Sequence, residues 1–345
     1  MRIYIDKGNI ESFVLSAASD PNEFAKCNLM LKKHFDMHLN LSQLDFAQSK
    51  LCMEWANTLL DGRGKNQIHL NAPLKVFPPR PINPNTFGDE FDEQQKSAVY
   101  LIDDIAAVSV LETKGNYIIG EVGNEIDTLR QLMIGDEDEL YTQSLEPLKR
   151  YFFAGNWSGL DNSVLPCTDI VITDGYILSN PSLYKTNLIA LIKKIATRVT
   201  FTTINIVIFC LSSIKDTKGN IYVPVWADIR SMIKNELKAE DIDVTVTFVA
   251  SDSAKDFEEH DRTICTNYLY YVPGATLNFY DSRGNFTSTG RHFTVHSKAK
   301  ESYKIESDEF IKDMQSLITG IETKSKNGLI DKDNASILSG FLHFS

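Results

Sequence analysis

Apolar runs and helical periodicities alternate along the second half of the chain. The predicted strands cover Asp169–Leu178, Ile204–Leu211 and Asp243–Ala250. Between them, apolar residues at mostly helical spacing predict helices over Ser182–Arg198 and Ala227–Lys238. Strands that alternate with helices pair in parallel through right-handed crossovers. Residues 165–345 are therefore predicted to form a layered α/β domain.

The first half of the chain has a different pattern of apolar and polar residues. It opens with a predicted strand, Arg2–Asp6, and two helices follow over 21–39 and 41–60. Five prolines crowd into residues 73–84, so this segment is predicted to be an extended connector. Beyond it the expected elements are a strand over 98–102, a hairpin over 106–122, and helices over 124–133 and 138–153. Residues 1–155 are thus predicted to be a mixed α+β domain.

Composition narrows the class of protein. The chain has 345 residues, of which 43% are hydrophobic, and this suits two folded domains. No run of eighteen apolar residues and no signal segment are present, so we expect no membrane span and a cytoplasmic location. Five scattered cysteines predict reduced, mostly buried thiols. A net charge of −11 disfavours unspecific binding to nucleic acid or anionic membranes.

The strongest chemical signal is the segment that contains His260, Arg262 and Asn267. In a strand, His260 and Arg262 would point to the same face, since side chains alternate. A neutral imidazole can attack phosphorus, and a fixed cation can neutralise the charge that develops on the phosphate oxygens. The side-chain carbonyl of Asn267 could orient the ring. The pattern therefore predicts a site for a phosphate ester.

The spacing His-x-Arg-x4-Asn resembles the His-x-Lys-x4-Asp signature of the phospholipase D superfamily. Gly274 and Asn278 lie in a loose version of the Gly-Ser-x-Asn segment that follows in that family. Asp174-Gly175-Tyr176, in the turn that ends the first apolar run, resembles the family's Asp-Pro-Tyr turn. The His-Asp-Arg form is also similar to the phospholipase-D-like C-terminal domain of MIT-domain proteins. The resemblance covers residues 165–345.

The resemblance implies a metal-independent phosphodiesterase without a cofactor, such as a nuclease of a microbial antiviral defence or toxin system. His260 would be the nucleophile or acid, and Asn267 would orient it. Arg262, Gly274 and Asn278 would bind phosphate. With one motif per chain, the second imidazole would come from an identical subunit, so a homodimer is predicted.

An alternative is a non-catalytic module that binds a phosphorylated ligand or a protein partner, with residues 1–155 as the interaction surface. It is favoured by Arg262 in place of Lys and Asn267 in place of Asp, because asparagine cannot stabilise an imidazolium as a carboxylate does.

Two further histidines are candidates for a second acid. His296 and Lys298 repeat the His-x-Lys spacing, but too few residues separate them from His260 for a second structural repeat. His296 or His292 could still protonate a leaving group if either faces the same crevice.

The first half contains acidic residues that superficially resemble the metal cluster of PIN-type nucleases. They are Asp6, Glu54, Asp103 and Asp104. The predicted hairpin over 106–122 does not suit the alternating layout of that fold, and acidic residues at strand ends are usually solvated. We therefore predict no metal site.

Overall fold

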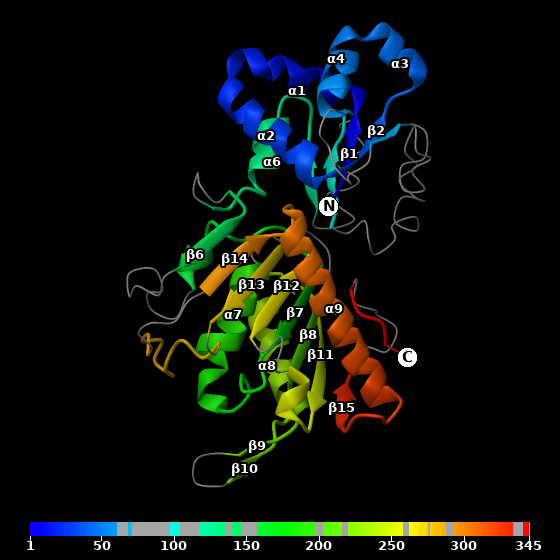
Figure 1. Cartoon of the computed structure of the whole chain (residues 1–345). Coiled ribbons are helices and arrows are strands. Elements are labelled where there is room, and N and C mark those ends of the chain that lie inside the picture. Colours follow the sequence, from blue (N-terminus) through cyan, green and yellow to red (C-terminus); the bar gives the residue numbers. More distant parts are fainter. Residues whose placement is uncertain are drawn as a thin grey trace. The chain divides into compact units, whose positions relative to one another are not determined.

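The structure, a computed structural model, describes residues 1–60, 68–70, 97–103, 117–135, 140–145, 157–196, 203–215, 220–257, 262–274, 277–287, 293–333 and 341–344. The chain divides into two compact units (Figure 1). Unit 1 comprises Met1–Met133 and Ser297–Lys304, and unit 2 comprises Ile134–His296 and Ile305–Ser345. The boundary near residue 133 lies earlier than the predicted one, because a strand over 142–145 pairs within the sheet of unit 2.

Unit 1 is built on a five-stranded sheet with the order β3-β2-β1-β4-β5. The strands are β1 (Arg2–Asp6), β2 (Asp36–Asn40), β3 (Ile68–Leu70), β4 (Val99–Leu101) and β5 (Ile118–Gly120). All four strand pairs of this sheet are parallel. The central β1 is almost entirely buried, as expected for a strand that is covered on both faces.

This parallel sheet corrects the prediction of a mixed α+β domain. Residues 104–116, which include the first half of the predicted hairpin, lie outside the described residues, as does the connector over 73–84. The second half of that hairpin forms β5, which pairs in parallel with β4. A sheet of parallel strands with helices between them is typical of α/β folds. Unit 1 is therefore an α/β unit in the part that the structure describes.

The helices of unit 1 begin and end where local signals change. They are α1 (Lys7–Ser19), α2 (Pro21–His34), α3 (Gln43–Gln48), α4 (Lys50–Leu60) and α6 (Glu125–Arg130). Asp20 caps α2 by accepting a hydrogen bond from the backbone of Glu23. The predicted helix over 21–39 ends at His34 because residues 36–40 switch to the two-residue period of β2.

Unit 2 contains an eight-stranded mixed sheet with the order β15-β11-β8-β7-β12-β13-β14-β6. Its parallel core consists of β7 (Asp169–Thr173), β8 (Ile204–Leu211) and β11 (Val244–Ser251), which confirms the three predicted strands. The other strands are β12 (Thr263–Thr266), β13 (Leu269–Pro273), β14 (Phe293–Ser297), β6 (Thr142–Leu145) and β15 (Gly328–Asp331). β12 pairs antiparallel with both β7 and β13.

Helices cover both faces of this sheet. The long helix α9 (Glu301–Glu322), orange in Figure 1, packs Phe310, Met314 and Leu317 against one face. Helix α8 (Trp226–Lys238) packs on the other face, where Trp226 contacts Phe248. The predicted helix over 182–198 is a π-helical turn, Lys185–Ile189, followed by α7 (Ala190–Ile195). Within the described part of the chain, none of the helices is long and apolar enough to cross a membrane.

Candidate functional site

The carboxyl ends of β7, β8 and β11 lie side by side at one end of the sheet of unit 2. This row of strand ends is the edge that carries the candidate site. Because β12 runs antiparallel to β7, its first residue, Thr263, pairs with the last residue of β7, Thr173. The backbone N–H of Thr263 donates to the Thr173 hydroxyl at 3.1 Å. Arg262 therefore lies at the edge where Asp174 begins the turn after β7. His260 belongs to residues 258–261, which lie outside the described residues.

Arg262 lies in a turn and not in the strand. β12 begins at Thr263, and Arg262 has a φ of 69°, in the left-handed region that non-glycine residues rarely adopt. The expectation that pleating sets its direction is therefore corrected. The turn, and not the two-residue period of a strand, sets where the guanidinium points.

Asn267 lies at the opposite end of β12. Its side-chain oxygen accepts hydrogen bonds from the backbone N–H groups of Thr168 and Asp169, at 2.8 and 3.2 Å. Its amide nitrogen donates to the Thr168 hydroxyl at 3.0 Å, and the residue is fully buried. The four residues of β12 separate it from Arg262, a span of five residue steps or about 17 Å in extended chain. The predicted grouping of Arg262 and Asn267 in one crevice is thus corrected: Asn267 fastens the start of β7 to the end of β12.

The loop after β13 returns to the edge that carries Arg262. Ile264 pairs with Tyr271, so the hairpin brings the exposed Gly274, just beyond the end of β13, to the same end of the strands as Arg262. The predicted phosphate ligands Arg262 and Gly274 are thereby brought to one edge. Asn278, the third predicted phosphate ligand, is half-buried in the loop over 277–287.

Asp174 joins this loop to the turn after β7. Its fully buried carboxylate accepts hydrogen bonds from the backbone N–H groups of Tyr176 at 2.8 Å and Leu277 at 2.9 Å. Asn187, in the π-helical turn, pairs with both backbone polar groups of Tyr280 at 2.9 Å. Buried side-chain bonds to backbone therefore fix the loop at two points, and they set its position beside the edge.

Asp256 adds a negative charge near this edge, and the ammonium group of Lys326 already pairs with that charge. Its carboxylate accepts hydrogen bonds from the Lys326 ammonium at 2.8 Å and from the Ser251 hydroxyl. Burial raises the pKa of Asp256, but the bonds from Lys326 and Ser251 outweigh this and hold the pKa below its usual value. Asp256 therefore stays ionised at neutral pH, and the paired Lys326 reduces its repulsion of a phosphate.

The second candidate acid, His296, lies within the sheet. Its Nδ1 is 3.1 Å from the Thr142 hydroxyl, and its ring lies beside that of Tyr270, with ring centroids 6.5 Å apart. Tyr270 pairs with Cys265, inside β12 and away from the edge. His296 is thus not grouped with Arg262, and His292 lies outside the described residues.

The cysteines do not supply a nucleophile. All five carry reduced, buried thiols, as predicted. Burial raises the pKa of Cys27 and of Cys167 to about 12, so these thiols stay protonated at neutral pH.

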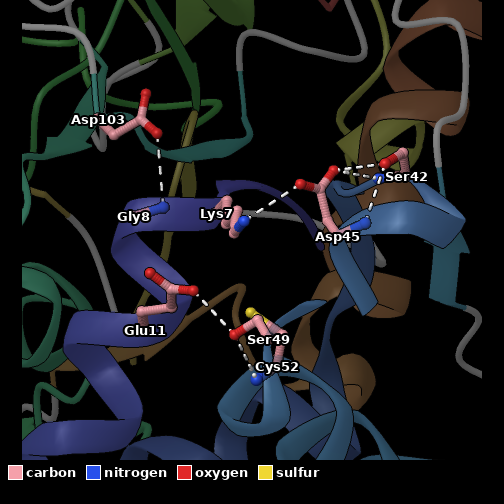
Figure 2. A network of polar contacts seen from close by, with 8 residues as sticks. All are labelled: Lys7, Gly8, Glu11, Ser42, Asp45, Ser49, Cys52 and Asp103. Carbon is pink, nitrogen blue, oxygen red and sulfur yellow. Dashed lines mark hydrogen bonds and ion pairs between the residues drawn. The ribbon is translucent and has the colours of Figure 1, made fainter. Parts of the chain in front are cut away.

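Unit 1 has a network of polar contacts at the carboxyl ends of β1 and β4, and Figure 2 shows those of Asp103 with Gly8 and of Asp45 with Lys7 and Ser42. The Asp6 carboxylate accepts hydrogen bonds from the Asn40 side chain at 2.8 Å and from the backbone N–H of Asp103 at 3.1 Å. Asp103 in turn accepts from the backbone N–H of Gly8. Sequence reasoning recognised Asp6 and Asp103 but excluded this edge because of the predicted hairpin over 106–122. The first strand of that hairpin lies outside the described residues, and its second strand is β5, which pairs in parallel with β4.

The carboxylates of this network are bound by protein groups. Asp45, which the sequence analysis missed, accepts from the Lys7 ammonium at 3.2 Å and from the backbone and hydroxyl of Ser42. Hydrogen bonds from Ser42 first, and then from Lys7, lower the pKa of Asp45 to about 2. Glu54 pairs instead with Lys50 on the exposed face of α4. Among the described residues, no three His, Cys, Asp or Glu side chains converge so as to hold a metal ion.

The described residues of unit 1 therefore do not fit the metal centre that a PIN-type nuclease would need. Asp104 lies outside the described residues. Comparison of the sequence with protein-family models and with curated proteins found no match to either.

Proposed function

We propose that unit 2 is a phospholipase-D-like phosphodiesterase that acts on nucleic acid as a homodimer, without a metal ion. The placement of Arg262, Gly274 and the Asp174 turn at one edge of the sheet carries this proposal. In sheets of this kind, ligands bind outside the carboxyl ends of the parallel strands. Two residues of the motif, Arg262 and Gly274, therefore lie at the edge where a sheet of this kind binds ligands.

The proposed chemistry has two steps. An imidazole nitrogen of His260 attacks the phosphorus and forms a P–N bond, while the leaving oxygen takes a proton from the His260 of a second subunit. Water then gives a proton to the His260 of the second subunit, attacks the phosphohistidine, breaks the P–N bond and returns both imidazoles to their starting states. Arg262 neutralises the charge that develops on the phosphate oxygens in both steps.

A second candidate function is the binding of a phosphorylated ligand without catalysis. It is supported by the position of Asn267, whose polar groups hold Thr168 and Asp169. Without a carboxylate or carbonyl from this residue, an imidazolium at the motif would lack the stabilisation that Asp gives in a His–Asp pair. The edge would then bind phosphate through Arg262 and backbone N–H groups alone.

The test is cleavage of labelled DNA, RNA and a generic phosphodiester in the presence of EDTA. We expect the wild type to cleave, and we expect His260→Ala to abolish cleavage. Arg262→Ala should lower kcat by about 100-fold or more, and Arg262→Lys should lower it less, because lysine keeps the charge. The matched control is Lys238→Ala, which removes an exposed cation at the far end of α8 and should leave cleavage unchanged.

Three results would redirect the assignment. Equal cleavage by wild type and His260→Ala would exclude His260 as the nucleophile. Cleavage that requires a divalent cation would exclude the metal-independent mechanism. Phosphate or oligonucleotide binding that is lost in Arg262→Ala, without cleavage by the wild type, would establish the binding module instead.

A further inference from the structure

A short arm leaves the sheet of unit 2 between β8 and α8. It consists of β9 (Ile214–Lys215), β10 (Ile221–Tyr222) and the stretch 223–225 that leads into α8. β9 and β10 pair antiparallel and form a two-stranded sheet of their own. Figure 1 shows this hairpin projecting beyond the eight-stranded sheet.

The outer face of the arm is apolar. Ile221, Val223 and Val225 follow the two-residue period of extended chain, and their exposed fractions are 69%, 58% and 55%. The residues between them face inward: Pro224 is buried, and the Tyr222 hydroxyl is 2.9 Å from the Tyr184 hydroxyl. A hairpin that only has to stay in solution turns polar residues outward. Three β-branched apolar residues in one exposed row therefore indicate a contact surface.

The arm begins at the edge that carries the proposed site. The last residue of β8, Leu211, donates its backbone N–H to the carbonyl of Gly175, in the turn that Asp174 begins. Tyr222 is joined through Tyr184 to the segment that follows this turn, since the Tyr184 hydroxyl also donates to the Leu178 carbonyl at 2.8 Å. The arm and the turn are thus held together by hydrogen bonds.

The charge distribution limits what can cover the row. Residues 220–226 carry no charge, in a chain whose net charge is −11. A second copy of this chain would be repelled by much of the remaining surface, but not by this segment. The row is also self-complementary, because a twofold axis through Val223 places Ile221 opposite Val225 of the other copy. Pro224 has no N–H, so packing of side chains, and not extension of the sheet, suits this contact.

We propose that two copies of the chain pack their arms against each other around a twofold axis, with Val223 at the centre. This inference rests on the proposed function, because the site uses a second histidine that only another copy supplies. The arm leaves from the end of β8, at the end of the sheet that carries Arg262, so the contact lies beyond that same end in both subunits.

The first test is the mass of the full-length chain in solution, measured by light scattering over a dilution series. The wild type should have twice the mass of one chain. Val223→Glu should raise the dissociation constant by at least about 100-fold, since two carboxylates would be buried against apolar groups. The matched control is Leu15→Glu, which makes the same change at an exposed leucine of α1 and should leave the dimer intact.

The second test uses cross-linking at the axis. The five native thiols are buried, so a cysteine introduced on the arm is the exposed one. Under mild oxidation, the Val223→Cys variant should form a covalent dimer, in which a disulfide joins the introduced cysteines of two chains. Lys215→Cys, on the other strand of the arm and away from the axis, should not.

The outcomes separate this inference from the proposed function. The arm interface would be overturned if the wild type were a monomer at all concentrations, or if the Val223→Glu variant were still a dimer. Equal cross-linking of the two cysteine variants would overturn it as well. A dimer that Val223→Glu dissociates, in a protein that cleaves no phosphodiester, would support the interface and reject the enzyme. His260→Ala should remain a dimer, because His260 is not part of the arm.

Discussion

The amide group of Asn267 joins the end of β12 to the start of β7, and this position determines what a carboxylate would do there. An introduced carboxylate would lose the hydrogen bond to Thr168 and would lie beside the buried Asp169. Burial and the neighbouring negative charge favour its neutral form. Placing the Asp of the phospholipase D signature at this position should therefore weaken the fold.

We expect Asn267→Asp to lower the free energy of unfolding by about 1–3 kcal/mol at pH 7. Because the folded-state pKa of the new carboxyl would be raised, the loss is full above that pKa. It disappears as the pH falls toward the unfolded value of about 3.9. Urea unfolding at several pH values measures this, with the exposed Asn235→Asp as the control. Equal stability at pH 7 together with gained cleavage would show that Asn267 lies in a catalytic crevice.

The residues around the site were only partly predictable from the sequence. The spacing placed Arg262 and Gly274 together, because a hairpin returns to the edge where it began. It could not place Asn267, because it does not show that β12 begins after Arg262 and ends just before Asn267. Asp45 was missed because its partner Lys7 is 38 residues away in the sequence.

At the scale of elements, α3 begins with a reciprocal cap that also sets the charge of its first turn. The Ser42 hydroxyl accepts from the backbone N–H of Asp45, and the Asp45 carboxylate accepts from the backbone N–H of Ser42. The same carboxylate receives Lys7 from α1. The cap therefore connects the start of α3 to α1.

Ser42→Ala should destabilise unit 1 by about 1 kcal/mol, the usual cost of losing an N-cap hydroxyl. It should also raise the pKa of Asp45, which is about 2 in the wild type. A lowered folded-state pKa stabilises the protein above the unfolded pKa and ceases to do so as the pH falls through the folded value. In the variant this loss should begin at higher pH, and NMR titration of the Asp45 carboxyl measures it. An unchanged pKa would mean that the backbone N–H of Ser42 and the Lys7 ammonium set it without the hydroxyl.

The strands and helices with the clearest periodicity were predicted, and the interruptions were not. β7, β8, β11 and α8 lie where apolar spacing placed them. The predicted helix over 41–60 divides at Ser49, which leaves the helix and donates its hydroxyl to Glu11 of α1. A tertiary partner decides this break, and no local pattern shows it.

At the scale of the whole molecule, unit 2 begins at Ile134, before the boundary between residues 155 and 165 that the sequence pattern predicted. Trp157 is fully buried, and its ring packs edge-on against Phe279, Tyr280 and Phe293. β6 completes the sheet by pairing with β14. Neither contact can be inferred from the sequence, because the partners lie more than a hundred residues apart.

A fragment of residues 134–345 should therefore unfold cooperatively, whereas a fragment of 165–345 should be less stable by at least about 3–5 kcal/mol, since it lacks Trp157 and β6. Chemical denaturation followed by circular dichroism compares the two. Equal midpoints would place the true boundary near residue 165.

The pairing of β6 with β14 also has a consequence for synthesis on the ribosome. Thr142 and His296, which face each other in this pair, are 154 residues apart. At about 5–20 residues per second, β14 follows β6 out of the ribosome after roughly 8–30 s. During that interval the nascent chain carries a strand whose neighbour has not been made. The edge of the sheet that is closed last is thus the one most open to chaperones and to mispairing between nascent chains.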